Sequence, residues 1–355
     1  MVIIIGAGII GTSIAYYLSK YGATDVVVLE KEKFAGTGVT KYCQGGIRTQ
    51  FTTEINIKFS LESLRELKGK SIKFNKIGYL LLDQDNTAEE RVKMQNFLGV
   101  KSKYLEPTEI KRLYPFLEMY EINGGSFCPE DGYADPALLL DFYIKGAKDK
   151  GIQFEYETEV KEILKDGDKV VGVETNKGKF EGTVILAAGP QSKELGEKIG
   201  LNIPIIKKRK YMVLMDGMFQ DFPIIMEFPT GWYIKKELKE NMAGMSGKVE
   251  TVDFEKKEEA VNEIIEATVK RITFLRSANI RRVDSSIADE TPDKHAIIDN
   301  SVEGLIIATG FSGHGFMHSP AAGKAVKSLV KGAPPFIDIS PLKLNREYNS
   351  TELII

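Results

Sequence analysis

Three glycines near the start of the sequence, Gly6, Gly8 and Gly11, have the spacing of a phosphate-binding loop. The loop follows the apolar segment 2–5 and precedes a helical pattern, so a helix N-terminus would present unpaired N–H groups to an anion. Glu30 ends the next apolar segment, where an acid accepts hydrogen bonds from ribose hydroxyls. This order predicts a dinucleotide site, and the acid disfavours a ribose 2′-phosphate.

Two further apolar segments, 182–189 and 304–310, end in small residues. Their unbroken hydrophobic character is typical of strands buried on both faces of a parallel sheet. The endings Ala188-Gly189 and Thr309-Gly310 would let the backbone approach a flat ligand, although tight packing of helix on sheet is the alternative. Together with the glycine loop, they favour a flavin dinucleotide, which is longer than the half of NAD that one such loop binds.

The composition fits a globular protein with two domains or one large interleaved unit. The 355 residues include 48 Lys and Arg against 50 Asp and Glu, so the charge balance gives no reason to expect a nucleic acid partner. The basic run 207–210 is interpreted as a strand entering solvent, in preference to a phosphate site. The sequence shows neither the basic region of a secretory signal nor the roughly 18–20 apolar residues of a membrane span. We therefore expect a cytoplasmic protein without a membrane span.

The cysteines and histidines do not predict a metal site. Cys43 and Cys128 are too few for a Cys-based zinc site, and a disulfide between them is not expected in a cytosolic chain. His314 and His318 have the i, i+4 spacing of a metal pair, but Pro320 and two intervening glycines argue against a helix there.

Periodic patterns divide the chain into helices and strands. Helices are predicted over 53–68, 87–97, 107–113, 136–150, 255–271 and 321–331, and strands over 76–82, 153–158, 160–165, 170–175, 211–215, 231–236 and 242–246. A dinucleotide-binding part therefore opens and closes the chain, with strand-rich insertions between its pieces. We expect a mixed α/β fold whose discontinuous FAD-binding domain covers 1–72, 130–202 and 283–340, whose substrate domain covers 73–129 and 203–282, and whose tail, 341–355, is loosely structured.

Four sequence blocks resemble the D-amino-acid oxidase superfamily of FAD enzymes, and most of all its branch of sarcosine oxidases and archaeal L-proline dehydrogenase β subunits. The blocks are the glycine loop with Glu30-Lys31, the segment 36–51, the motif Asp131-Gly-x-x-Asp-Pro136, and the segment 291–316, which ends Gly-Phe-Ser-Gly-His-Gly-Phe. They follow the family's order over most of the chain, and the last block is the most specific. The resemblance implies a Rossmann-like part that binds FAD and an interleaved antiparallel sheet that covers the flavin and holds the substrate.

The resemblance also implies which residues contact FAD. Glu30 and Lys31 would hold the adenosine ribose, Val160 would contact adenine, and 313–317 would lie at the pyrimidine end of the flavin. Backbone N–H groups at the start of the following helix would stabilise negative charge at flavin N1 and O2. The full set expected at the cofactor is Gly6, Ala7, Gly8, Ile9, Ile10, Gly11, Glu30, Lys31, Thr37, Gly38, Cys43, Gln44, Gly45, Gly46, Ile47, Val160, Ala188, Gly189, Gly310, Gly313, His314, Gly315, Phe316 and Met317.

Four positions depart from the oxidase pattern of this family. Ser286 stands where covalent sarcosine oxidases attach flavin through a cysteine, so FAD is expected to bind non-covalently. Phe51 and Met317 stand at the substrate-carboxylate pair of monomeric sarcosine oxidase, and neither can bind a carboxylate. The lysine credited with oxygen activation aligns near Met242, and the loss of that cation favours a dehydrogenase over an oxidase.

The activity that the resemblance implies is oxidation of a small amino acid or secondary amine, such as L-proline, sarcosine or glycine, by hydride transfer from the α-carbon to flavin N5. Arg48 is the first candidate for a positive charge near the flavin, and Arg281 and Arg282 are candidates for the substrate carboxylate. Tyr233 or Trp232 would form the pocket wall.

Two alternatives remain open. A 2-hydroxyacid dehydrogenase on the same fold would need a general base, for which the sequence offers His314 or His318. His314 is otherwise expected beside the flavin, or held in its loop by packing alone. The second alternative is an FAD-carrying subunit that is active only in a hetero-oligomer, and a homo-oligomer is also compatible with the resemblance.

Overall fold

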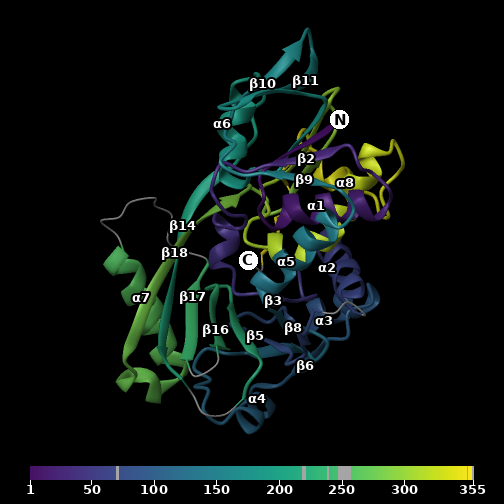
Figure 1. Ribbon diagram of the computed structural model, residues 1–355. Helices are drawn as coiled ribbons and strands as arrows, with labels where there is room; N and C mark the ends of the chain where they lie inside the picture. The colour runs from purple at the N-terminus through teal and green to yellow at the C-terminus, as the bar shows by residue number, and fades with distance from the viewer. Residues whose placement is uncertain (69–71, 218–220, 238–239, 247–256, 350, 354–355) are drawn as a thin grey trace.

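The chain is described by a computed structural model that covers residues 1–68, 72–217, 221–237, 240–246, 257–349 and 351–353 (Figure 1). Its α-helices are α1 (Ile9–Lys20), α2 (Glu54–Leu67), α3 (Ala88–Phe97), α4 (Pro107–Leu113), α5 (Pro136–Lys148), α6 (Ser192–Glu197), α7 (Lys257–Arg271) and α8 (Gly315–Val330). Short 3₁₀ helices are η1 (Val39–Tyr42), η2 (Gly189–Gln191), η4 (Thr273–Ser277) and η5 (Ser340–Leu342). The helix predicted over 255–271 corresponds to α7, and its first two predicted positions lie outside the described residues.

A six-stranded sheet forms the centre of the dinucleotide-binding part. Its strands, in spatial order, are β19 (Ile297–Asp299), β20 (Leu305–Thr309), β13 (Thr183–Leu186), β1 (Val2–Ile5), β2 (Val26–Leu29) and β9 (Gln153–Glu155). All neighbouring pairs are parallel except β19 with β20. The predicted buried parallel strands are therefore present, and they bring segments from the start, middle and end of the chain together.

Both faces of this sheet are covered, which explains why its strands are apolar throughout. Ile4 of β1 belongs to a core shared with α1, α5 and α8, whereas Ile3 and Ile5 belong to a core on the opposite face. That second core is closed by a three-stranded meander of β10 (Val160–Asp166), β11 (Lys169–Thr175) and β12 (Gly178–Glu181). The meander projects at the top of Figure 1.

A second, mostly antiparallel sheet of eight strands forms the other part of the molecule. In spatial order it contains β18 (Ile280–Glu290), β14 (Ile206–Asp216), β17 (Glu240–Met245), β16 (Trp232–Glu237), β15 (Ile224–Phe228), β5 (Tyr79–Asp83), β7 (Gly124–Cys128) and β6 (Lys103–Leu105). Among the strand pairs of this sheet that the structure describes, only β15 with β5 is parallel. A small sheet contains β3 (Gly46–Ile47), β8 (Gly132–Ala134) and β4 (Phe74–Asn75). Each of its strands falls, in the sequence, between strands of the two large sheets.

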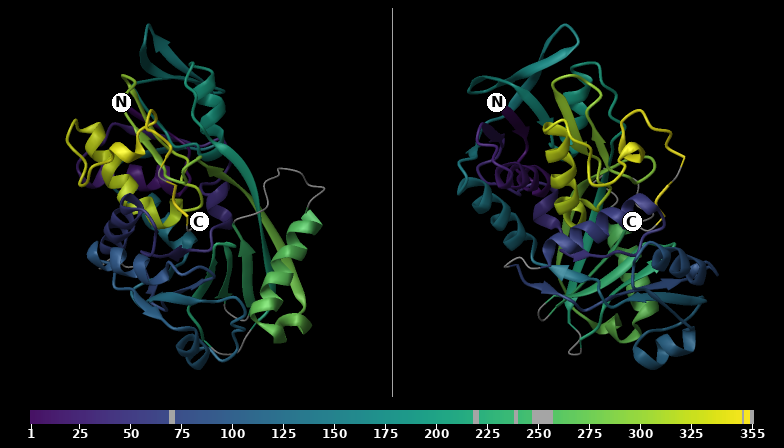
Figure 2. Two further views of the ribbon diagram at one scale, coloured as in Figure 1. Left: turned by 180° about the vertical axis from the view of Figure 1, so that it is seen from behind. Right: turned by 90° about the vertical axis from the view of Figure 1, so that its right-hand side faces the viewer.

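Strands β14 and β18 connect the two parts of the molecule. They pair from Ile206 with Glu290 to Met215 with Ile280, and Figure 2 shows them running from the upper part of the molecule into the lower one. The domain boundary that we expected between residues 282 and 283 falls inside β18. The two parts therefore share these strands, with no linker at that point.

Helix α8 begins earlier than predicted, at Gly315, so the prediction that Pro320 excludes a helix around His314 and His318 was wrong. Proline removes the N–H that would bond the carbonyl four residues earlier. Here that carbonyl, of Phe316, accepts a hydrogen bond from Ser319 Oγ at 2.9 Å instead. The next N–H, of Ala321, donates to Ser63 Oγ at 3.3 Å. Neighbouring hydroxyls therefore replace what the proline disrupts.

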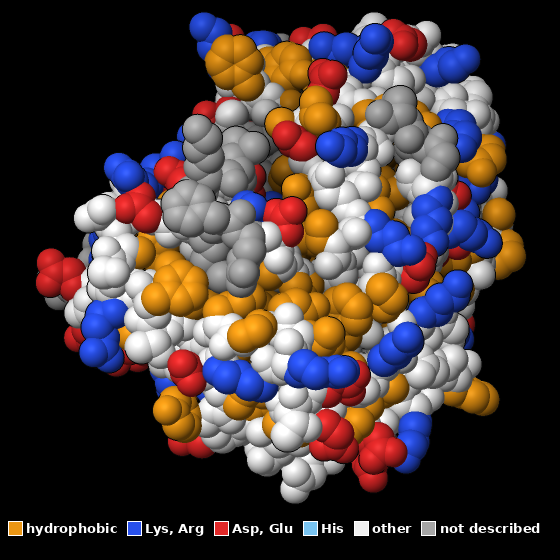
Figure 3. Space-filling model, turned by 90° about the horizontal axis from the view of Figure 1, so that it is seen from below, with side chains coloured by type: hydrophobic (Ala, Val, Ile, Leu, Met, Phe, Trp, Pro, Cys, Tyr) orange, Lys and Arg blue, Asp and Glu red, His pale blue; other side chains and the backbone are white. Residues whose placement is uncertain are grey.

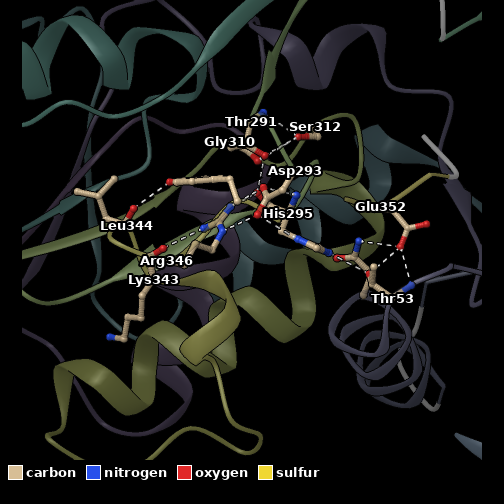
Figure 4. Close-up of polar contacts among 12 residues, drawn as sticks. Thr53, Thr291, Asp293, His295, Gly310, Ser312, Lys343, Leu344, Arg346 and Glu352 are labelled. Atoms are coloured by element: carbon tan, nitrogen blue, oxygen red, sulfur yellow. Dashed lines mark hydrogen bonds and ion pairs between the residues drawn. The ribbon is translucent and has the colours of Figure 1, made fainter. Parts of the chain in front are cut away.

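The tail, 341–355, was expected to be loosely structured, and for its described residues this expectation was wrong. Arg346 forms a buried two-bond pair with Asp293, at 2.7 Å from Nε and 2.8 Å from Nη2 (Figure 4). The carboxylate of Glu352 is buried and accepts hydrogen bonds from the N–H groups of Thr52 (2.8 Å) and Thr53 (3.0 Å), at the start of α2. A buried carboxylate at a helix N-terminus stabilises that terminus. The described part of the tail is thus anchored to the core, although only Leu342, Leu344 and Glu352 of its described residues are buried.

The surface mixes charges of both signs on the face drawn in Figure 3. Hydrophobic side chains gather in a band across the middle of that face, and blue and red side chains are interspersed on either side of it. The near balance of acidic and basic residues is therefore spread over this face rather than segregated. Among the described helices, none has both the length and the apolar character needed to cross a membrane.

We predict that Arg346→Ala lowers the free energy of unfolding by about 3–5 kcal/mol at neutral pH, because it leaves a buried carboxylate without its cation. Urea unfolding would measure this. Although burial raises it, the bonds and charge of Arg346 hold the pKa of Asp293 well below its ordinary range. The stabilisation is thus present above the unfolded pKa of about 3.9 and is lost as the pH falls below it.

The matched control is Arg281→Ala, which removes the pairing of an exposed arginine with Asp216. Exposed pairs contribute little to stability, so this variant should unfold like the parent. Equal effects of the two substitutions would show that the Asp293–Arg346 pair does not anchor the tail.

Candidate active site

An elongated cavity of about 780 Å³ lies between the parallel sheet and the antiparallel sheet. Its outer end is lined by Glu30, Lys31 and Val160, and its middle by the glycine loop and residues 36–40. Its inner end is bounded by β5, β14, β15, β16 and β18 of the antiparallel sheet and by the loop before α8; the side chains there are Arg48, Tyr79, Met212, Ile224, Met226, Tyr233, Ser286 and His314. An elongated ligand can therefore reach from the edge of one sheet to the face of the other.

The glycine loop lies against its neighbours so closely that side chains are excluded. Gly6 has a φ of +102°, and a Cβ there would lie 2.6 Å from the carbonyl oxygen of Ala187. A Cβ on Gly11 would lie 2.0 Å from the carbonyl oxygen of Gly6. Helix α1 thus starts directly beside β1, with Gly8, Ile9 and Ile10 on the cavity wall. The start of a helix at this place suits an anionic diphosphate.

The Glu30 carboxylate fixes the geometry of the same loop. Its Oε2 accepts from the N–H of Ala7 at 2.8 Å, and its Oε1 accepts from the N–H of Glu32 at 3.0 Å. A carboxylate accepts about four hydrogen bonds, so capacity remains for ribose hydroxyls from the cavity side. The N–H of Ile9 donates to Thr40 Oγ1 at 3.0 Å, which links residues 36–40 to the start of α1.

Arg48 lies buried at the inner end of the cavity. Its Nη1 donates to Met226 Sδ at 3.1 Å, its Nη2 lies 3.4 Å from His314 Nε2, and its guanidinium lies 4.5 Å from the centre of the Phe51 ring. Because arginine has no acceptor, His314 Nε2 must accept, which leaves the ring proton on Nδ1. Burial, and then the charge of Arg48, hold the pKa of His314 well below its ordinary range, so this imidazole is neutral.

Two buried aspartates hold the segments that carry these groups. Asp131 Oδ1 accepts from the N–H of Thr49 at 3.0 Å and from its Oγ1 at 2.7 Å, and burial raises the pKa of Asp131 to about 6. Asp289 Oδ2 accepts from the N–H groups of Gly310 (2.8 Å) and Phe311 (3.4 Å). Burial also raises the pKa of Asp289. The loop before α8 is therefore tied to β18.

Aromatic and sulfur-containing side chains complete the wall of the inner end. Tyr233 Oη is hydrogen-bonded by Gln44 Nε2, and the ring of Tyr79 lies across the same space. Burial raises the pKa of the Cys43 thiol to about 11, so Cys43 is protonated at neutral pH. A thiol in that state is a poor nucleophile, so Cys43 is part of the wall and not a reactive group.

Most residues expected at the cofactor line this cavity. They are Gly6, Gly8, Ile9, Ile10, Glu30, Lys31, Thr37, Gly38, Cys43, Gln44, Gly46, Val160, Ala188, Gly189, Gly313, His314, Gly315, Phe316 and Met317. Five others support the wall from behind it: Ala7, Gly11, Gly45, Ile47 and Gly310. Among the latter, Gly45 and Ile47 pair with β8, since the Gly45 carbonyl accepts from the N–H of Ala134 at 3.0 Å.

Arg281 and Arg282 do not reach the cavity, which corrects their expected role. Their side chains are 58% and 62% exposed and pair with Asp216 and Asp284 respectively. Both stand at the far end of β18, whereas Ser286 and Ala288 of the same strand line the cavity.

The expected role of Trp232 is also corrected. Its ring is fully buried, and its Nε1 donates to Thr268 Oγ1 at 3.0 Å. It therefore packs under α7 and away from the cavity, while Tyr233, the next residue along β16, faces the cavity.

His318 does not line the cavity, although it lies on α8 close to His314. Their rings are 5.7 Å apart, and His318 Nε2 lies 2.9 Å from Ser60 Oγ. Burial lowers the pKa of His318 to about 3. Within the described part of the chain, no three His, Cys, Asp or Glu side chains are grouped to hold a metal ion.

Sequence reasoning missed several residues of the inner end, among them Tyr79, Met212, Met226, Asp289 and Lys210. The basic run 207–210 was expected to enter solvent, but Lys207 and Lys210 both line the cavity. The alternation of a strand was the available signal, because Lys210 and Met212 of β14 must share a face.

We predict that Gly6→Ala yields a folded protein with little bound flavin, because the new Cβ would meet the Ala187 carbonyl beside the loop. The ratio of flavin absorbance to protein after purification measures this. The matched control is Gly178→Ala, at a φ of +116° with nothing within 4 Å of its Cβ position. Equal flavin loss in both variants would assign the effect to backbone strain and not to the loop.

Two comparisons with known sequences bear on the family of this chain. The family model described as "FAD dependent oxidoreductase" matches residues 1–329. The chain is similar to the mitochondrial dimethylglycine dehydrogenase of Mus musculus (28% identity over 97% of this chain) and to the sarcosine oxidase subunit beta of Arthrobacter sp (26% identity over 97% of this chain and 90% of that protein). It spans 44% of the length of the dimethylglycine dehydrogenase.

Solved structures agree with the fold. The crystal structure of L-proline dehydrogenase from P. horikoshii superimposes with a TM-score of 0.90, at 30% identity, covering 97% of this chain and 96% of that one. The glycine oxidase of Geobacillus kaustophilus superimposes with a TM-score of 0.83 at 22% identity, covering 98% of each chain, which bears on the fold alone. The family match over most of the chain, with the glycine loop, Glu30 and the loop before α8 on one cavity, shows that this chain belongs to the FAD-dependent oxidoreductase family.

Proposed function

We propose that this chain oxidises a small amino acid or secondary amine, such as L-proline, sarcosine or glycine, with non-covalently bound FAD. The flavin, when bound, supplies the chemistry by accepting a hydride at N5 from the substrate α-carbon. The observation that carries the proposal is the inner end of the cavity, where a buried cation, a neutral imidazole and a tyrosine meet at the start of α8. Relatives named for dimethylglycine, sarcosine and L-proline support the same substrate class.

The residues present fit FAD and non-covalent binding. Glu30 lies at the outer end of the cavity, the glycine loop lies in its middle, and the loop 313–317 lies at its inner end. Ser286 lines the cavity, and its hydroxyl cannot form the thioether that a cysteine would form there. The protein would therefore hold the cofactor by hydrogen bonds and packing along the length of the cavity.

Arg48 would provide positive charge at the inner end. Its burial weakens the screening of that charge by water, so its effect on a developing negative charge is larger than at a surface. The N–H groups at the start of α8 would add to this effect. His314, which is neutral, would keep Arg48 in place without adding a second charge.

The expectation of a dehydrogenase rested on the absence of a cation at Met242. Met242 lies on β17 and does not line the cavity, but Lys210 on the neighbouring strand β14 does. The argument from a missing cation therefore no longer applies. We retain a dehydrogenase in the proposal because the L-proline dehydrogenase structure is the 30% identical relative, and the experiment below includes air as an acceptor.

A 2-hydroxyacid is the second candidate substrate. Its oxidation needs a base for the hydroxyl proton, and His314 is the histidine on the described cavity wall. Its low pKa and the contact of its Nε2 with Arg48 make it a weak base, so an amine is favoured over a hydroxyacid. A third possibility is that the chain is active only together with a partner chain, since one similar protein is named as a subunit.

The purified yellow protein should be bleached when L-proline, sarcosine or glycine is added without oxygen, and it should regain colour slowly in air. D-Amino acids and 2-hydroxyglutarate complete the series. Bleaching by 2-hydroxyglutarate alone would replace an amine by a hydroxyacid as the substrate. Absence of bleaching by any of them, with flavin present, would indicate a subunit that requires its partner.

We predict that Arg48→Met lowers the rate of flavin reduction by about 100-fold or more, since it removes a preorganised charge at the reacting end. Stopped-flow absorbance measures the rate, and thermal unfolding checks the fold. Arg281→Ala serves as the control, because Arg281 is exposed and lies outside the cavity. A reduction rate unchanged by Arg48→Met would remove Arg48 from the site.

A further inference from the structure

Lys210 is a partly buried cation on the cavity wall with no role assigned so far. It projects from β14 beside Met212, and its Nζ lies 3.7 Å from the position that a Cβ on Gly313 would take. Gly313 is followed by His314, whose Nε2 lies 3.4 Å from Arg48 Nη2. Lys210 and Arg48 therefore flank the turn before α8, at the end of the cavity where the substrate is proposed to bind.

Lys210 shares its only carboxylate partner among the described residues. Glu290 Oε1 lies 2.9 Å from Lys210 Nζ, and Glu290 Oε2 pairs with Lys294 and, at 3.5 Å, with Lys208. Although burial raises it, the charge of Lys210 and the bonds from Lys294 lower the pKa of Glu290 to about 2. One ionised carboxylate thus faces Lys210 and Lys294 together, which leaves positive charge at the cavity wall.

The Lys210 ammonium also keeps donors available. An ammonium has three N–H donors, and Glu290 accounts for one of them. The side chain is 20% exposed and lines the cavity, so the remaining donors can meet an acceptor that enters from the cavity side. An anionic group is favoured as this acceptor, because Lys210 is positively charged and its neighbours Met212, Ser286 and Gly313 on the cavity wall carry no charge.

The other cations that line the cavity, as far as the chain is described, are accounted for. Lys31 and Lys198 lie with Val160 at the outer end, and Lys207 pairs with Glu194. Arg48 is enclosed by Met226, His314 and the Phe51 ring. At the inner end, Lys210 is therefore the cation that faces the cavity most openly.

We propose that Lys210 binds the substrate carboxylate and so restricts the site to amines that carry a free acid group. The inference rests on the proposed function, because it assigns a specificity-determining contact within the same site. Expected substrates are small amino acids, and the corresponding amides and simple amines would bind poorly. Glu290 is a positioning residue in this account, since it holds Lys210 without touching the ligand.

The test uses the flavin-loaded protein and acetate as the anion, with acetamide as its neutral counterpart. Titrations that follow the absorbance of the oxidised flavin give dissociation constants without turnover. Lys210→Met should weaken acetate binding roughly ten- to a hundredfold and leave acetamide unchanged. Lys294→Met is the matched comparison, because Lys294 pairs with the same carboxylate but does not line the cavity. Losing its charge near Glu290 should weaken acetate binding only a few-fold.

A second variant keeps the inference testable if Lys210→Met does not retain flavin. Glu290→Gln removes the competing negative charge, so acetate should bind several-fold more tightly. Unchanged acetate affinity in Lys210→Met, equal losses in the two lysine variants, or weaker acetate binding in Glu290→Gln would each overturn the role of Lys210. Failure of the proposed function looks different, because the parent would then bind acetate through Lys210 while no amine bleaches its flavin.

Discussion

The close approach of helix α1 to strand β1 is the constraint on which the rest of the structure depends. A Cβ on Gly11 would lie 2.0 Å from the Gly6 carbonyl oxygen, so only glycine allows the helix to start there. Helix α8 in turn packs on α1, with Ser13 Oγ donating to the carbonyl of Ser319 at 2.6 Å. The start of α8 carries the turn at Gly313 and His314. The inner end of the cavity is therefore positioned from the glycine loop in its middle, through helices α1 and α8.

The second organising feature is the pair of long strands β14 and β18. Their ends toward Ile206 and Glu290 reach the dinucleotide-binding part, and their ends toward Met215 and Ile280 belong to the antiparallel sheet alone. Residues of the same strand therefore have different surroundings at its two ends. Ser286 lines the cavity, whereas Arg282, four positions earlier, is exposed. Placement along this pair of strands, more than residue type, decides which side chains can meet a ligand.

Sequence patterns were sufficient where the determinants are local. The glycine loop, the apolar parallel strands and the start of the helix predicted over 136–150 each depend on residues close in sequence. At that start, Asp135 Oδ1 accepts from the N–H of Ala137 at 2.8 Å. They were insufficient where a distant partner decides. The start of α8 depends on Ser63, and the position of Lys210 depends on Glu290. Neither partner can be read from the segment that it affects.

The hydrogen bonds of Glu352 join two segments of the chain that are translated at very different times. Glu352 bonds the N–H groups of Thr52 and Thr53, which lie about 300 residues earlier and just beyond Arg48. During synthesis on the ribosome, the start of α2 therefore waits for its acceptor while 300 further residues are added. The segment that carries Arg48 is translated early, but it gains these neighbouring hydrogen bonds only after Glu352 has emerged. The inner wall of the cavity is thus coupled to a segment that is made much later.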